Sequence, residues 1–81
     1  MTFQQELINK YKKEGYKVLK IIRLNENGYP DLMLLKDGKT IYIESKEEND
    51  TLKPIQKARI KELRLLGFEA FCLQKNKGVI F

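Results

Sequence analysis

The pattern of hydrophobic and polar residues predicts two helices and at least four strands. Apolar residues recur at helical spacing in two segments, which predicts helices over residues 3–14 and 54–66, each ended by a glycine at Gly15 or Gly67. Runs of β-branched and apolar residues predict strands over residues 16–24, 31–35, 40–45 and 68–73, with residues 79–81 as a candidate short final strand. The predicted order is α-β-β-β-α-β, a mixed α/β domain with helices packed against a central sheet.

Length and composition indicate a single small globular domain. The 81 residues are enough for one small domain over 1–81, and 42% hydrophobic with 33% charged residues is typical of a folded globular chain. No apolar run approaches the roughly 20 residues that cross a bilayer, so no membrane role is expected. The N-terminal segment is polar where a signal peptide would be apolar, which predicts a cytoplasmic protein.

Two absences restrict the possible chemistry. The chain has no histidine and a single cysteine, Cys72, which excludes Ser-His-Asp and Cys-His catalysis and a structural zinc site built on cysteines. A metal site would use oxygen ligands, which favours magnesium, manganese or calcium over zinc. The net charge of +5 favours a polyanionic partner, although only weakly by itself.

The register of the predicted hairpin brings two acidic residues together. If Asp37 and Gly38 form its turn, Leu35 faces Thr40 and Asp31 lies directly opposite Glu44. Like charges at such a position, with Cβ atoms ~5 Å apart, are destabilising unless a cation compensates them. Lys46 projects from the same face as Glu44, while the other face of the hairpin is apolar.

This group fits a divalent-cation site. Two converging carboxylates are the ligands that a hard divalent cation prefers, and the Lys46 ammonium could hold or help to deprotonate an attacking water. The alternative is that Asp31 ends a turn while Glu44 and Lys46 lie on a solvated strand face. The predicted pairing and the Pro30-Asp31 opening favour the functional interpretation.

These residues resemble a known family. Pro30-Asp31, twelve intervening residues and Glu44-Ser45-Lys46 match the PD-(D/E)xK nuclease pattern, and with Gly28 to Leu32 and Gln56 the chain is similar to a stand-alone VRR-NUC domain. The resemblance runs from about Glu6 to Leu73. It implies a restriction-endonuclease-like core and a homodimeric Mg²⁺- or Mn²⁺-dependent nuclease of phage or bacterial type, acting on four-way DNA junctions. Ser45 departs from the family, where a β-branched apolar residue is commoner.

The resemblance also implies roles for individual residues. Asp31 and Glu44 would be metal ligands, with the Ser45 carbonyl as a third oxygen, and Lys46 would position and activate the attacking water. Two further residues would complete the site, each with an alternative. Glu6 would reach the metal through water, or else pair with Lys10 on the helix surface. Gln56 would orient the lysine or the water, or else cap its own helix.

DNA-binding residues are less sharply indicated, because the basic residues are spread along the chain. The candidates are Lys10, Lys53, Lys57, Arg59 and Tyr29. For most of the lysines, a solvated helix face is the better interpretation, and Tyr29 is as readily a turn aromatic. The alternative function is a non-catalytic nucleic-acid-binding module or accessory subunit, which would gain nothing from carboxylates facing a phosphate backbone.

Overall fold

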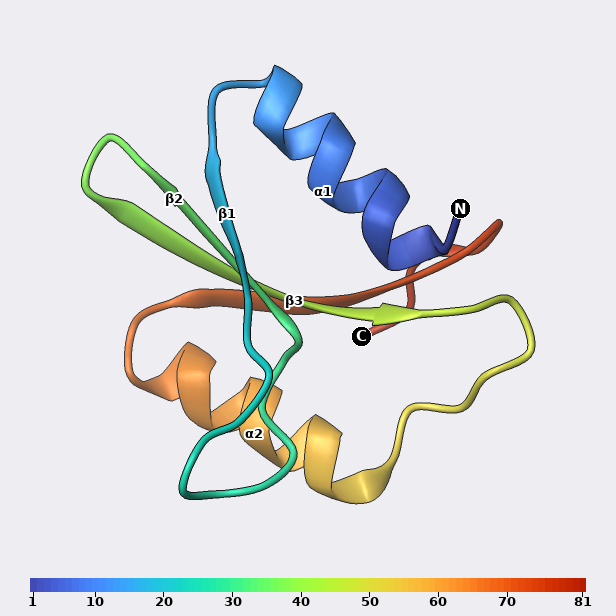
Figure 1. Cartoon of the computed structure of the whole chain (residues 1–81). Coiled ribbons are helices and arrows are strands. Elements are labelled where there is room, and N and C mark those ends of the chain that lie inside the picture. Colours follow the sequence, from blue (N-terminus) through green and yellow to red (C-terminus); the bar gives the residue numbers. More distant parts are fainter.

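A computed structural model describes residues 1–81 and shows a five-stranded sheet with one helix on each face (Figure 1). The elements, in chain order, are α1 (Phe3–Lys13), β1 (Lys17–Lys20), β2 (Leu32–Lys36), β3 (Lys39–Lys46), α2 (Pro54–Leu65), β4 (Glu69–Gln74) and β5 (Gly78–Val79). The strands lie in the order β1-β2-β3-β4-β5, with β3 and β4 parallel and the other pairs antiparallel. The predicted mixed α/β order is confirmed, with the final strand at Gly78–Val79.

The turn between β2 and β3 sets the register that the sequence predicts. Asp37 and Gly38 both have positive φ values, 52° and 75°, as the two central residues of a type I′ hairpin turn require. Leu35 therefore pairs with Thr40, and Leu32 with Ile43. Continuing the same register by one pair brings Asp31, just before β2, opposite Glu44.

The first strand is shorter than predicted, ending at Lys20 rather than Leu24. β1 runs antiparallel to β2, with Lys20 opposite Leu32, and Ile21 N–H still donates to the Asp31 carbonyl over 2.8 Å. In this register Pro30 would be the partner of Ile22, but no main-chain hydrogen bond joins the two segments beyond Ile21. Residues 21–30 instead form the loop that leads into Asp31.

Each face of the sheet has its own apolar core. The face toward α1 buries Leu7, Ile8, Val18, Leu32, Leu34 and Ile43. The face toward α2 buries Leu52, Ile60, Leu63, Ala70 and Cys72. Because side chains alternate along a strand, the second face also receives Tyr42, Glu44 and Lys46 of β3. The face that carries the predicted acidic residues is therefore covered by a helix and is not a solvated surface.

The crossover through α2 positions the second half of the sheet beside β3. Parallel pairing places Glu44 next to Cys72 and Lys46 next to Gln74. Neither helix has the length and apolar character needed to span a bilayer.

Candidate functional site

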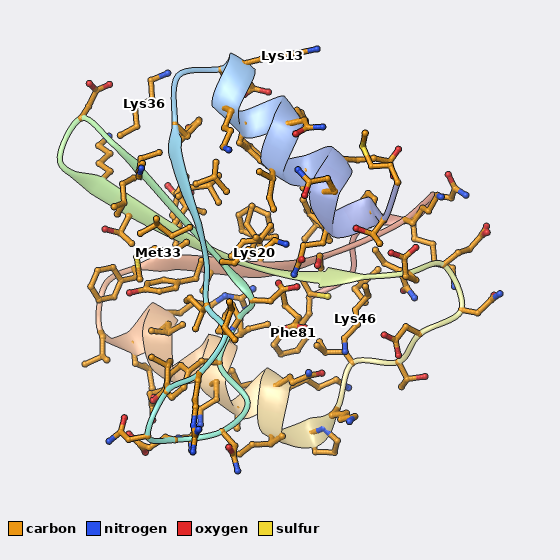
Figure 2. All side chains as sticks on the ribbon, viewed as in Figure 1. Lys13, Lys20, Met33, Lys36, Lys46 and Phe81 are labelled. Atoms are coloured by element: carbon orange, nitrogen blue, oxygen red, sulfur yellow. The ribbon has the colours of Figure 1, made fainter.

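The candidate site lies where β2 begins and β3 ends. Asp31 immediately precedes β2, and Glu44, Ser45 and Lys46 are the last three residues of β3. Lys46 projects from this end of β3 on the side of the sheet that α2 covers (Figure 2). The hairpin register thus brings Asp31 and Glu44 to the same end of the sheet, as the sequence predicts.

The Asp31 carboxylate is held by three hydrogen-bond donors. Ser45 N–H donates to Oδ1 over 2.9 Å, and the Ser45 hydroxyl donates to Oδ2 over 2.5 Å. The third donor is Gln4 Nε2 of α1, which lies 2.7 Å from Oδ2. Three donors from two different elements fix the orientation of this carboxylate.

Glu44 and Lys46 form a buried ion pair beside Asp31. Lys46 Nζ lies 3.7 Å from Glu44 Oε2, and their side chains are only 6% and 8% exposed. Burial and the nearby Asp31 charge raise the pKa of Glu44 to about 7, although Lys46 acts in the opposite direction. The site therefore concentrates negative charge that one lysine does not fully compensate.

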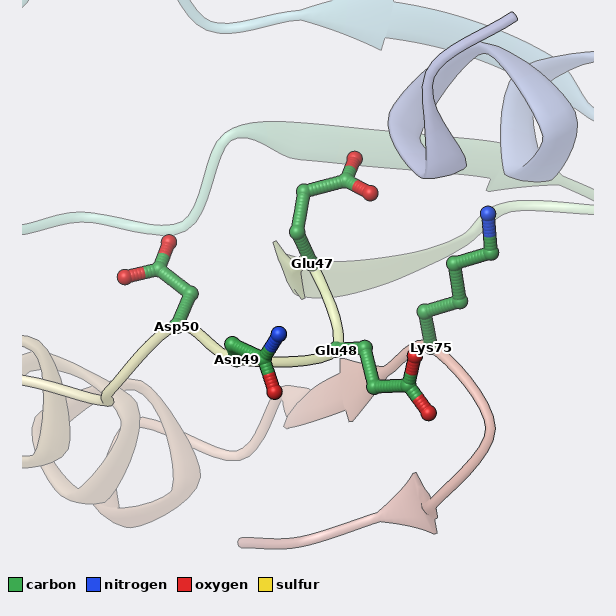
Figure 3. A pocket seen from close by; sticks show the side chains of 5 residues that line it. All are labelled: Glu47, Glu48, Asn49, Asp50 and Lys75. Atoms are coloured by element: carbon green, nitrogen blue, oxygen red, sulfur yellow. The ribbon is translucent and has the colours of Figure 1, made fainter.

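The acidic loop after β3 adds Asp50 to this group. Asp50 Oδ2 lies 3.8 Å from Lys46 Nζ. The buried Gln74 side chain holds the loop, because its Nε2 lies 3.0, 3.1 and 2.7 Å from the carbonyl oxygens of Glu47, Glu48 and Asp50. An adjoining hollow of about 490 Å³ is lined by Glu47, Glu48, Asn49, Asp50 and Lys75, whose side chains Figure 3 shows. Gln74 was not among the predicted site residues, because nothing local marks its contact with a distant loop.

The residue of helix α1 that contacts Asp31 is Gln4 and not the predicted Glu6. Glu6 is exposed and forms no ion pair with Lys10, and its role as an outer ligand through water stays a prediction. The helical wheel contained the signal for Gln4: it lies between Tyr11 and Ile8, inside the apolar arc, whereas Glu6 lies beyond the edge of that arc. A polar residue on the buried face of a helix needs a partner, and Gln4 finds it in Asp31.

Gln56 adopts the capping alternative. Its Oε1 accepts the Lys53 N–H over 2.9 Å at the start of α2, which satisfies one of the N–H groups that every helix leaves free at its N-terminus. No hydrogen bond joins Gln56 to Lys46 or Glu44, so a role in orienting the lysine stays a prediction.

Two predicted DNA-binding residues are engaged within the fold. The Arg59 Nε donates to the Asn27 carbonyl over 2.8 Å, and its guanidinium lies 4.9 Å from the centre of the Tyr29 ring. The Tyr29 hydroxyl donates to Glu62, and this hydrogen bond raises the pKa of Tyr29. Both side chains would have to give up some of these contacts to bind DNA, so their DNA-binding role stays a prediction. Both residues fix the 21–30 loop on α2.

Close packing under that loop also explains Gly28. Its φ is +88°, and a Cβ there would lie 2.7 Å from the Ile55 side chain and 3.2 Å from the Ile55 carbonyl. A larger residue would push the loop off α2, and Asp31 follows three residues later.

The other predicted DNA-binding residues, Lys10, Lys53 and Lys57, are exposed. Lys57 belongs to a basic row along α2 that surrounds the Phe81 ring. The ring centre lies 5.9 Å from Lys57 Nζ, 5.8 Å from Lys61 Nζ and 5.2 Å from the Arg64 guanidinium carbon. None of these three cations pairs with an acidic side chain. Arg64 does donate to the main-chain oxygens of Ala70 and Phe81, so the uncompensated positive charge of the row is that of Lys57 and Lys61.

The donor set fits a hydrated hard cation. No group of three or more His, Cys, Asp or Glu side chains converges closely enough to hold a metal ion alone. The carboxylates of Asp31 and Glu44 are oxygen ligands, and the Ser45 carbonyl stays a predicted third. Mg²⁺ commonly binds through one or two carboxylates and keeps several waters, so Asp31 and Glu44 suit it better than they suit zinc.

Comparison with known proteins agrees with this fold. No curated protein matches the chain at a significant level. A solved structure described as a VRR_NUC domain has a TM-score of 0.74 and 27% sequence identity, covering 85% of this chain and 76% of that one. The Archaeoglobus fulgidus Holliday junction resolvase Hjc, from an archaeal hyperthermophile, has a TM-score of 0.70 and 19% identity over 90% of this chain and 65% of its own. At that identity the resolvase shows the shared fold alone.

The family model decides the assignment, because it covers nearly the whole chain and both halves of the site. It matches residues 2–76, which include Gln4, Asp31, Glu44 and Lys46. The chain belongs to the VRR-NUC domain family and has its nuclease fold.

Proposed function

We propose that this protein is a metal-dependent DNA endonuclease whose active site is formed by Asp31, Glu44 and Lys46. The observation that carries the proposal is the buried Glu44–Lys46 pair next to Asp31. Burying a carboxylate and an ammonium costs free energy, and placing a second carboxylate nearby adds repulsion. Perturbed carboxylates of this kind are typical of functional sites, and a bound cation would relieve the repulsion.

Asp31 and Glu44 would hold Mg²⁺ or Mn²⁺, with the Ser45 carbonyl as a third oxygen. When bound, such an ion supplies positive charge that stabilises the pentavalent phosphorus and the leaving oxygen of a phosphodiester. Asp31 is pre-oriented for this role by Ser45 and Gln4. Glu44 must release its proton to bind the ion, which it does readily around its pKa of about 7.

Lys46 would position the attacking water and compensate the charge that builds up on the phosphate. Glu44 and Asp50 hold its ammonium from two sides, at 3.7 and 3.8 Å. Water would attack in line with the leaving oxygen: the new P–O bond forms as the P–O bond to the leaving oxygen breaks, the proton of the attacking water passes to solvent, and the leaving oxygen takes up a proton from solvent. Preorganised charge of this kind is effective because it needs no rearrangement during the reaction.

The proposed substrate is branched DNA, with a four-way junction as the leading candidate. The structural similarity to the Hjc resolvase supports this choice, and so does the basic row on α2. Symmetric cleavage of a junction needs two sites, so we propose a homodimer. Exposed apolar side chains available for an interface include Ile22 and Leu65, each 89% exposed.

A non-catalytic DNA-binding module is the second candidate function. Its support is the same basic row, which would bind DNA whether or not the chain cuts it. The buried carboxylates favour the enzyme, because a pure binder loses affinity by holding acidic groups near phosphates.

A substrate panel tests the proposal. A labelled four-way junction, a matched duplex and a single strand are incubated with the protein in Mg²⁺, Mn²⁺ or EDTA. Glu44→Ala serves as the inactive variant and Glu69→Ala, an exposed acid on β4, as the control. We expect metal-dependent cutting of the junction by wild type and Glu69→Ala only. Equal cutting of all three substrates would reject the junction specificity, and folded protein that binds DNA without cutting would favour the binding module.

A further inference from the structure

We infer that Gln4 is a positioning residue for Asp31, and that α1 thereby contributes a neutral amide to the site and not a third carboxylate. The inference deepens the proposed function and rests on it for its catalytic meaning. The contact itself stands on geometry alone, because Gln4 Nε2 lies 2.7 Å from Asp31 Oδ2.

The placement of Gln4 depends on how α1 is tied to the site. Thr2 caps the helix by accepting the Gln5 N–H over 3.1 Å. The Phe3 N–H donates to Glu47 Oε2 over 3.0 Å, which joins the first turn of α1 to the acidic loop. Leu7 and Ile8 then bury the following turn against the sheet. The first turn of α1 is thus fixed on both sides of Gln4.

Gln4 reduces the number of lone pairs with which Asp31 can bind a cation. A carboxylate offers about four lone-pair positions, two on each oxygen. Ser45 hydroxyl and Gln4 together occupy both positions on Oδ2, while Ser45 N–H occupies one on Oδ1. A single position remains, on Oδ1. Gln4 therefore leaves Asp31 able to contact a cation through one oxygen only.

The amide also limits the charge of the site. With Gln4 neutral, α1 adds no negative charge to Asp31, Glu44 and Asp50, which Lys46 already compensates in part. An acid in place of Gln4 would meet Asp31 at hydrogen-bond distance, where like charges repel. That acid would destabilise the protein without metal but would attract a cation more strongly.

The test compares variants at Gln4 with matched variants at the next residue. Gln4→Met keeps the length of the side chain but removes the donor, and Gln4→Glu introduces the acid. Gln5→Met and Gln5→Glu are the controls, because the Gln5 side chain bonds only Asn9 on the same helix. Mn²⁺ affinity is measured by calorimetry, and stability by urea unfolding in EDTA.

We expect Gln4→Met to bind Mn²⁺ about tenfold more weakly than wild type, as is usual for loss of a residue that orients a ligand. Gln4→Glu should bind Mn²⁺ more tightly than wild type and yet unfold at lower urea in EDTA. Both Gln5 variants should bind Mn²⁺ as wild type does. Unchanged Mn²⁺ affinity in Gln4→Met and Gln4→Glu would overturn the inference.

A metal-free measurement separates this inference from the proposed function. The hydrogen bond to Asp31 should shift the side-chain NH₂ signals of Gln4 in a ¹⁵N spectrum, and Asp31→Ala should move them toward the values of a free amide. If wild type does not bind Mn²⁺ while this shift is present, the metal-dependent function fails and the positioning contact stands. If Asp31→Ala leaves the Gln4 signals unchanged, the contact itself is rejected.

Discussion

Lys46 and Glu44 lie side by side within the sheet–α2 layer, with Nζ 3.7 Å from Oε2 and both side chains less than a tenth exposed. A buried ion pair is weak evidence for stability, because desolvation of the two charges offsets most of their attraction. Here Asp31 adds a further negative charge close by. A catalytic role accounts for these buried charges better than a contribution to stability does. The pair is therefore central to the proposed active site.

The raised pKa of Glu44 predicts a pH-dependent stability in EDTA. The pKa is about 7 in the folded protein, against 4.5 for an unperturbed group. The folded state therefore binds this proton more tightly than the unfolded state does. The resulting stabilisation is complete below pH 4.5 and is lost as the pH rises through 7, by at most on the order of 3 kcal/mol. Urea unfolding at a series of pH values measures it.

Glu44→Gln is the control for that pH series. The amide cannot titrate. Between pH 4.5 and 7 the free energy of unfolding should therefore fall much less in Glu44→Gln than in wild type. Mg²⁺ should stabilise wild type above pH 7 and leave Glu44→Gln unaffected, because ligand binding to the folded state raises its stability. If the two proteins show the same pH profile, Glu44 is not the titrating group.

Arg59 is predicted to act on stability and not on DNA binding. Arg59→Met removes a hydrogen bond to Asn27 and the stacking on Tyr29, so unfolding should become easier by about 1–2 kcal/mol. The exposed Lys61→Met on the same helix is the control and should stay within about 0.5 kcal/mol of wild type. A stable Arg59→Met protein with weakened DNA binding would restore the DNA-contact interpretation.

The basic row on α2 is predicted to contact DNA phosphates. Lys57→Gln/Lys61→Gln should flatten the plot of log affinity against log salt by about 2, since each phosphate contact contributes roughly 0.9 to that slope. The comparison is Lys12→Gln/Lys13→Gln, which removes the same charge from α1 on the opposite face of the sheet. Equal slopes for the two double variants would place the DNA elsewhere.

Much of this architecture could be predicted from the sequence because its determinants are local. Asp37-Gly38 fixes the hairpin register by its turn geometry, and that register alone brings Asp31 opposite Glu44. The end of β1 was predicted wrongly at Leu24, because the apolar strand pattern continues past Lys20 while pairing with the β2 segment stops at Ile21. The end of a strand depends on where its partner strand stops, which the residues of the strand itself do not show.

The contacts at the site that the sequence did not indicate have a similar cause. The resemblance implied that Gln56 on α2 would orient the lysine or the water, with capping as the alternative, and its oxygen accepts the N–H of Lys53. The inward amide that meets Asp31 is Gln4, on the other helix. Gln74 holds three loop carbonyls that no periodicity reveals. These contacts depend on how loops and layers meet, which a single-sequence pattern does not contain.

The most direct test of the active site is the cleavage rate of Lys46→Met on a labelled four-way junction in Mg²⁺. Lys39→Met, at the exposed hairpin end of the same strand, is the matched control, and urea unfolding checks that both variants are folded. We predict that Lys46→Met binds the junction but cuts it at least about 100-fold more slowly than wild type, while Lys39→Met cuts at the wild-type rate. Wild-type cleavage by folded Lys46→Met would contradict the assignment of this site.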